Sequence, residues 1–117
     1  MQKPVSLRSL LPDDLPVLER LWQLYRHDLS EFRGMLPDVT GLFAPGRLPH
    51  HLHDTNTAGY LIRRDENPVG FAFVSGVTVA PLRIVEFFVV RAVRRSGVGS
   101  SALFPASRIF LRTPGCC

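Results

Sequence analysis

The sequence has little cysteine and no long hydrophobic run. Its two cysteines, Cys116 and Cys117, are adjacent at the end of the 117 residues, so no disulfide framework links distant parts of the chain. The apolar stretches stay below about ten residues, whereas a bilayer-spanning helix needs roughly 20. The first residues also lack the apolar core of a signal peptide. These absences argue against a disulfide-stapled or membrane protein and predict a cytoplasmic location.

Lysine is nearly absent too, and the basic charge is almost entirely arginine. The chain has 14 basic and 10 acidic residues and a formal net charge of +4. The arginines are scattered, apart from a cluster at Arg91, Arg94 and Arg95. A nucleic-acid reader usually combines such charge with a recognition helix or stacking aromatics, but here the aromatics fall within apolar strand patterns. We therefore expect neither nucleic acid nor membrane as a partner.

What is present fits one globular domain. Hydrophobic residues make up 45% and charged residues 21% of the chain, which is typical of a compact fold with one core. The pattern predicts a strand over 4–9, then a helix from Leu15 to Gly34 with Asp13 and Asp14 as N-cap and first-turn acids. Residues 34–56 are rich in glycine and proline and are expected to form a loop with at most one short helix.

The second half of the chain reads as strands followed by a helix. Residues 57–64 and 69–77 predict an antiparallel hairpin around a short polar turn. Residues 84–90 are apolar except for Glu86, which predicts a central strand covered on both faces. A helix with apolar positions at helical spacing should follow, interrupted by Pro105.

The densest chemical signal is the turn between that strand and that helix, from Arg94 to Gly99. Two glycines, Gly97 and Gly99, allow a close backbone approach, and a helix start offers free N–H groups, so the turn suits a phosphate. The alternative is an ordinary turn with solvated arginines. A P-loop is excluded because serines stand where its lysine is needed. A dinucleotide fingerprint, completed by Ala102, remains a weaker alternative because no acidic residue follows.

The segment VEFFVVRAVRRSGVGSSAL resembles motif A of the GNAT superfamily of acetyl-CoA-dependent N-acetyltransferases, whose RxxGxG element is matched by Arg94, Gly97 and Gly99. Upstream, LWQLYRHDLSEF is similar to the family's first helices and YLIRRDENPVGFAFV to its second and third strands. The resemblance covers nearly the whole chain in the right order. It implies an α/β (α+β) fold with a mixed, mostly antiparallel sheet flanked by helices.

The resemblance also implies site residues. Acetyl-CoA would be the acetyl donor, with no metal, and its pyrophosphate would lie on the backbone from Arg95 to Ser100 while Val89 and Val90 pair with the pantetheine arm. The expected cofactor-binding residues are Val89, Val90, Arg91, Arg94, Arg95, Ser96, Gly97, Val98, Gly99 and Ser100.

Glu86 is the candidate base that removes the proton of the acceptor amine. The alternative is a strand carboxylate neutralised by Arg83 or Arg91. The acceptor is expected to be a small-molecule primary amine of unknown identity. Its pocket would be lined by Tyr25, His27, Asp28 and Glu31 near the end of the first helix, where acidic residues would favour a cationic amine.

Two further features bear on these expectations. His50, His51, His53 and Asp54 lie close together, but their spacing matches no zinc motif, so we expect no metal site. Family members continue beyond motif A with a fifth strand, a helix carrying a tyrosine acid and two final strands. The resemblance therefore implies a single, incomplete N-acetyltransferase domain over 1–117 that lacks the C-terminal strands. An inactive remnant that binds CoA or a protein partner is the alternative, and a homodimer is compatible with either.

Overall fold

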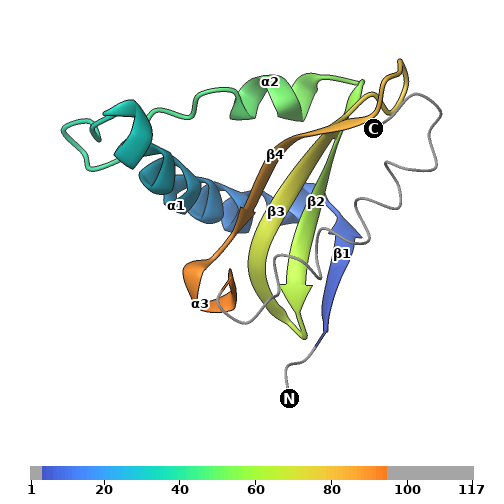
Figure 1. Cartoon of the computed structure of the whole chain (residues 1–117), viewed down its shortest axis with the longest axis horizontal. Helices are drawn as coiled ribbons and strands as arrows, with labels where there is room; N and C mark the ends of the chain where they lie inside the picture. Colours follow the sequence, from blue (N-terminus) through green and yellow to red (C-terminus); the bar gives the residue numbers. More distant parts are fainter. Residues whose placement is uncertain (1–3, 95–117) are drawn as a thin grey trace.

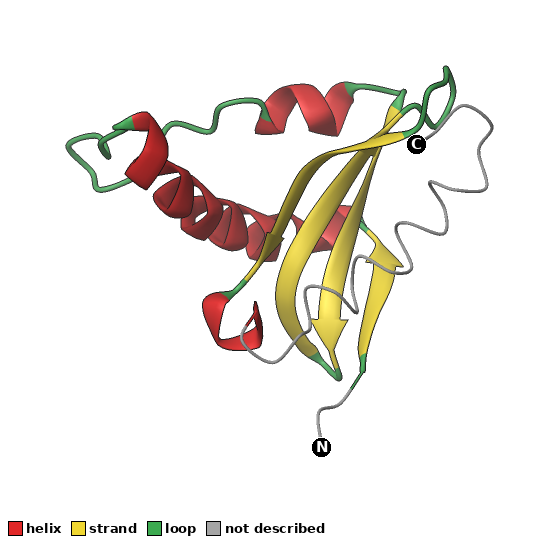
Figure 2. Ribbon diagram, viewed as in Figure 1, coloured by secondary structure: helices red, strands yellow, loops and turns green. Residues whose placement is uncertain are grey.

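The computed structural model describes residues 4–94, which form an antiparallel sheet with helices packed on it (Figure 1). The expected cofactor turn after Arg94 and the helix interrupted at Pro105 lie outside these residues. In chain order the elements are β1 (Val5–Ser9), a 3-10 turn (Pro12–Asp14), α1 (Leu15–Arg33), α2 (Leu48–His53), β2 (Thr57–Arg64), β3 (Asn67–Ser75), β4 (Arg83–Val89) and α3 (Arg91–Arg94). The α+β class and the predicted hairpin are confirmed (Figure 2).

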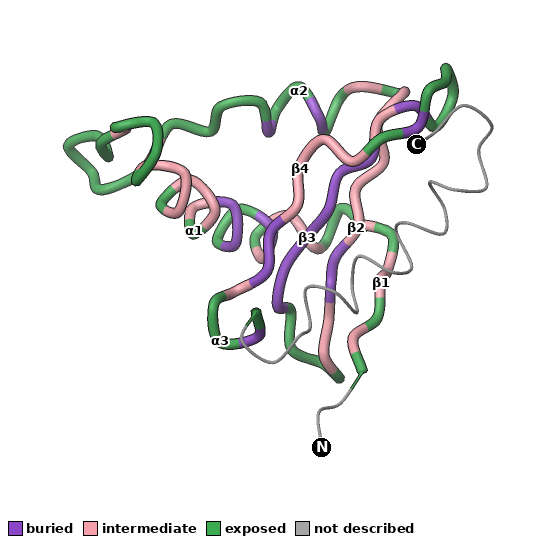
Figure 3. Tube along the Cα trace, in the orientation of Figure 1, coloured by how far each residue is buried: buried purple, intermediate pink, exposed green. Residues whose placement is uncertain are grey.

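The four strands lie in the order β1-β2-β3-β4, and every neighbouring pair is antiparallel. The expectation that residues 84–90 form a central strand is wrong for the part of the chain that the structure describes, where β4 pairs with β3 alone. Ile84 to Phe87 are only partly buried, whereas β3 is buried from Val69 to Val74 (Figure 3). An apolar run indicates burial but carries no information on how many neighbours a strand has.

The first helix begins and ends close to the predicted positions. Gly34 adopts a left-handed φ of 68° and its N–H donates to the Ser30 carbonyl, a C-terminal arrangement that glycine favours. Asp14 occupies the N-cap position of α1 as predicted, but its side chain makes no capping hydrogen bond, and the first turn of α1 holds no acid, so the first-turn part of the prediction is wrong. The Asp14 carboxylate accepts hydrogen bonds from the Leu11 N–H and from both terminal nitrogens of Arg8, so it bonds to no N–H of α1.

The main core lies between α1 and one face of the sheet. Trp22 is 1% exposed, Leu18 is fully buried, and both pack against aromatic side chains that alternate along β3 and β4. Helix α2 contributes Leu48 to the same cluster, and Figure 1 shows both helices on one side of the sheet. Among the helices that the structure describes, none is long and apolar enough to cross a membrane.

Side chains of α1 hold the long segment that leads to α2. The Trp22 indole donates to the Pro45 carbonyl over 2.8 Å, and the Gln23 side chain makes two 2.9 Å bonds with the backbone of Phe43. Arg26 donates to the Ala44 carbonyl at 3.0 Å. These bonds fix the residues just before α2 against α1, and α2 in turn carries the histidines.

Candidate functional site

Glu86 is the centre of the candidate site, and two side chains from other elements hold its carboxylate. The Tyr25 hydroxyl donates to Oε1 over 2.5 Å, and His51 Nε2 lies 2.8 Å from Oε2. The Glu86 side chain is 15% exposed and the His51 side chain 5%. The expected alternative, neutralisation by Arg83 or Arg91, is wrong: Arg91 pairs with Asp28, and the partners of Glu86 are Tyr25 and His51.

The core places these three residues together. Tyr25 comes from α1, His51 from α2 and Glu86 from β4, where it lies opposite Phe73 of β3. The His51 ring stacks on Phe73 with 5.2 Å between ring centres, and Tyr25 lies edge-on to Trp22 at the same separation. Packing on the buried aromatics of β3 and α1 therefore sets the positions of both partners of Glu86.

The electrostatics of the cluster favour a neutral phenol beside the carboxylate. Burial, and then the hydrogen bond to Glu86, raise the pKa of Tyr25 well above its usual value, so its hydroxyl stays a donor at neutral pH. When Glu86 is ionised, the His51 Nε2–H donates a hydrogen bond to its Oε2, and in a neutral His51 ring Nδ1 is then an acceptor. Nδ1 is buried and has no hydrogen-bond partner among residues 4–94. The cluster is thus a carboxylate held by two donors, a suitable arrangement for a positioned proton acceptor.

Glu86 opens onto a polar cavity of about 390 Å³ between α2 and β4. Arg47 and His50 line it from the α2 side, and Arg83 and Glu86 from β4. Ligand pockets typically range from about 300 to 1,000 Å³. The cavity is therefore large enough for a small molecule that contacts Glu86.

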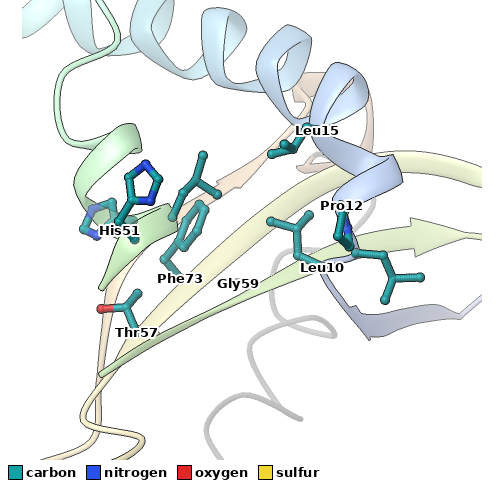
Figure 4. Close-up of a pocket in the computed structure, with 10 residues that line it drawn as sticks. Leu10, Pro12, Leu15, His51, Thr57, Gly59 and Phe73 are labelled. Atoms are coloured by element: carbon teal, nitrogen blue, oxygen red, sulfur yellow. The ribbon is translucent and has the colours of Figure 1, made fainter. Parts of the chain in front are cut away.

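A second and mainly apolar cavity, of about 450 Å³, lies on the other side of His51. Figure 4 shows Leu10 and Leu15 on one side of it and His51 and Thr57 on the other, with Phe73 between them. His51 and Thr57 line both cavities. The His51 ring is therefore a shared wall between a polar and an apolar cavity.

The expected cofactor residues at the end of β4 are engaged within the chain. The Val90 N–H donates to the Val69 carbonyl at 2.8 Å, and the Val89 carbonyl accepts from Arg94 Nε at 2.6 Å. The Arg94 guanidinium also binds the Asp28 carboxylate and lies 5.5 Å from the centre of the Phe88 ring. Arg95, Ser96, Gly97, Val98, Gly99 and Ser100 lie outside the described residues.

The expected acceptor-pocket residues are divided between two places. Tyr25 contacts Glu86, whereas His27 and Asp28 line a groove of about 210 Å³ at the end of β4. Glu31 is exposed and lines none of the three cavities. The sequence did not predict the contact between His51 and Glu86, because the two residues are 35 positions apart and only the packing of α2 brings them together.

Two histidines of α2 each contact a different carboxylate of the protein. His51 contacts Glu86, while His50 lies 3.7 Å from the Asp54 carboxylate. Hydrogen bonds from the Asn56 N–H and then from Thr57 hold the pKa of Asp54 below its usual value. Within residues 4–94, no group of three or more histidine, cysteine or acidic side chains is arranged to hold a metal ion.

No protein-family model matches the chain, and no curated protein matches it either. The interpretation of the site therefore depends on the residues themselves.

Proposed function

We propose that the chain is a cytoplasmic N-acetyltransferase of the GNAT type, which transfers an acetyl group from acetyl-CoA to a primary amine. The observation that carries the proposal is the Glu86 carboxylate, which Tyr25 and His51 hold at the edge of a cavity. Glu86 lies on β4, which is followed by α3 and then by the rest of the Arg94–Gly99 segment, and this whole stretch is the part of the sequence that resembles motif A. A carboxylate positioned as a base and a phosphate-binding turn on one strand are what the reaction requires.

The groove at the end of β4 has side chains that suit the donor. Arg91 and Arg94 would attract phosphate groups, and Phe88 and Val90 offer apolar surface to a pantetheine arm. Arg94 would exchange its ion pair with Asp28 for a phosphate. Acetyl-CoA, when bound, supplies an acetyl group activated as a thioester.

In the proposed chemical step, Glu86 performs one proton transfer. The amine nitrogen forms a bond to the acetyl carbon as the carbon–sulfur bond breaks, and Glu86 takes the proton that the nitrogen loses. The leaving thiolate takes a proton from water, and Glu86 returns its proton to the solvent, so that the products are an amide and a thiol. Tyr25 and His51 orient the carboxylate, and removing such a base typically slows a reaction by about 10²- to 10⁴-fold.

The test combines calorimetry with acetyl-CoA and a thiol-release assay over a panel of primary amines. We expect Glu86→Gln to bind acetyl-CoA like the wild type and to lose about 10²- to 10⁴-fold in kcat. Glu66→Gln, an exposed change in the β2–β3 turn, is the matched control and should retain full turnover. Failure of the wild-type chain to bind acetyl-CoA would contradict the proposal, and full turnover in Glu86→Gln would remove Glu86 from the mechanism.

A second candidate is a non-catalytic protein that binds CoA or a protein partner. Its support is the edge of β4, which pairs only with β3 in the described residues and offers backbone groups to another strand. Acetyl-CoA binding without thiol release from any amine would favour this candidate. Binding of NAD in place of acetyl-CoA would instead favour the dinucleotide interpretation of Gly97 and Gly99.

A further inference from the structure

The polar cavity beside Glu86 is lined by cations from two separate elements. Arg47 immediately precedes α2, and Arg83 is the first residue of β4. Both arginines are exposed, whereas Glu86 lies deeper, with its side chain 15% exposed. A molecule in this cavity therefore meets two guanidinium groups and two carboxylates, those of Asp54 and Glu86.

The acids that line the cavity already have partners. Asp54 accepts 2.9 Å hydrogen bonds from the Asn56 N–H and from the Thr57 hydroxyl. Glu86 accepts from Tyr25 and contacts His51. Among residues 4–94, neither Arg47 nor Arg83 forms an ion pair with any carboxylate. In the described residues, the cavity therefore presents two arginines without an ion-pair partner beside two carboxylates that are already hydrogen-bonded.

We propose that this cavity binds a small molecule that carries both a carboxylate and an amine, as an amino acid does, with the carboxylate on Arg47 and Arg83 and the amine toward Glu86. Guanidinium groups match the planar, two-oxygen geometry of a carboxylate, and such charge-assisted bonds are among the strongest in proteins. A polyamine or another purely cationic amine would meet two arginines at the same place. The cavity thus favours an amine that also carries a carboxylate, in place of the purely cationic amine that the acids of α1 led us to expect.

The anion site is independent of acetyl transfer, and only the assignment of the bound molecule as the acetyl acceptor depends on the proposed function. The experiment is therefore a binding measurement on the full 117-residue chain without acetyl-CoA. L-leucine and L-leucinamide serve as probes, because they share the amine and the apolar body and differ in the carboxylate. Backbone amide chemical shifts in NMR titrations report affinity and location.

We expect L-leucine to shift the amides of Thr57, Ser75 and Val85, which line the cavity, and to bind about 10- to 100-fold more tightly than L-leucinamide. Arg47→Gln and Arg83→Gln should each weaken L-leucine binding about tenfold or more and leave L-leucinamide unchanged. Arg83→Lys should recover part of the affinity, because a lysine keeps the charge but loses the two-pronged geometry. Circular dichroism of each variant checks that the exposed substitution leaves the fold intact.

Arg20→Gln is the control, because it removes one exposed positive charge of α1 that does not line this cavity. Its L-leucine affinity should equal that of the wild type. The proposal is overturned if L-leucinamide binds as tightly as L-leucine, or if neither binds at about 10 mM. It is also overturned if Arg20→Gln weakens binding as much as Arg47→Gln does. If the protein fails the acetyl-CoA test but passes this one, the anion site stands and the proposed reaction is rejected.

Discussion

Glu86 shows how the chain compensates a largely buried charge with donors. Removing a carboxylate from water is costly unless other groups hydrogen-bond to it. Here Tyr25 and His51 provide those contacts, and both are themselves held by aromatic packing. Because neither partner is an arginine, the positive charge of Arg47 and Arg83 remains available to a ligand.

Tyr25 should make the stability of the protein sensitive to alkaline pH. Its pKa in the folded chain is raised by burial and by the bond to Glu86, so the fold favours the neutral phenol. The stabilisation is complete below the ordinary tyrosine pKa of about 10 and is lost as the pH rises above it. Tyr25→Phe should lower the free energy of unfolding by about 1 kcal/mol at pH 7, the net contribution of one hydrogen bond. It should also reduce the loss of stability that follows as the pH rises above about 10.

Urea unfolding between pH 7 and pH 11 measures both effects. Tyr60→Phe is the control, because Tyr60 is the other tyrosine of the chain, lies on β2 and makes no contact with Glu86. The assignment is incorrect if Tyr25→Phe and Tyr60→Phe give the same dependence on pH.

The elements show which features local sequence patterns determine. The limits of α1 follow from apolar residues at helical spacing and from Gly34, and the β2–β3 hairpin from two β-rich runs around a short turn. Both are local properties of the chain, and both are confirmed. The edge position of β4 is a long-range outcome, and the bond of Arg8 to Asp14 joins β1 to the turn that follows it. The periodic patterns predicted neither. The contact of His51 with Glu86 was missed for the same reason.

The junction of β3 and β4 should depend on Gly70. A Cβ added at this position would lie 2.0 Å from the Phe88 carbonyl oxygen, which belongs to the backbone of β4 and cannot rotate away. Gly70→Ala should therefore cost about 3 kcal/mol, the upper end of the usual range for overpacking, and should displace the strand that carries Glu86.

Gly34→Ala is the comparison for this prediction. Nothing lies within 4 Å of its added Cβ, so the only cost should be that of holding alanine in a left-handed backbone conformation, about 1 kcal/mol. Chemical denaturation gives both values, and NMR shifts of Tyr25 report whether its contact with Glu86 persists. Equal costs for the two variants would show that the β3–β4 spacing is adaptable.

At the scale of the whole molecule, charge balance determines how the protein responds to acid. The formal net charge is already +4 at pH 7 and rises as carboxylates are protonated, so self-repulsion grows as the pH falls. Asp14, Asp38 and Asp54 each have a lowered pKa in the folded chain, with hydrogen bonds as the largest cause. These three residues lie before α1, in the loop before α2 and after α2, so their protonation affects the segments that flank α1 and α2.

The stability of the protein should therefore fall steeply in acid. A carboxylate with a lowered pKa stabilises the fold above its unfolded pKa of about 4, and this contribution is lost as the pH falls through the lower folded value. Replacing Asp38 and Asp54 together by asparagine should reduce stability at pH 7 and flatten the loss between pH 4 and pH 2, because fewer groups then take up protons on unfolding. Thermal unfolding across this range measures the slope.

Asp13→Asn is the control, because Asp13 lies in the same 3-10 turn as Asp14 but makes no bond to Arg8, and the slope of this variant should match that of the wild type. A double variant as acid-sensitive as the wild type would place the acid response in other carboxylates.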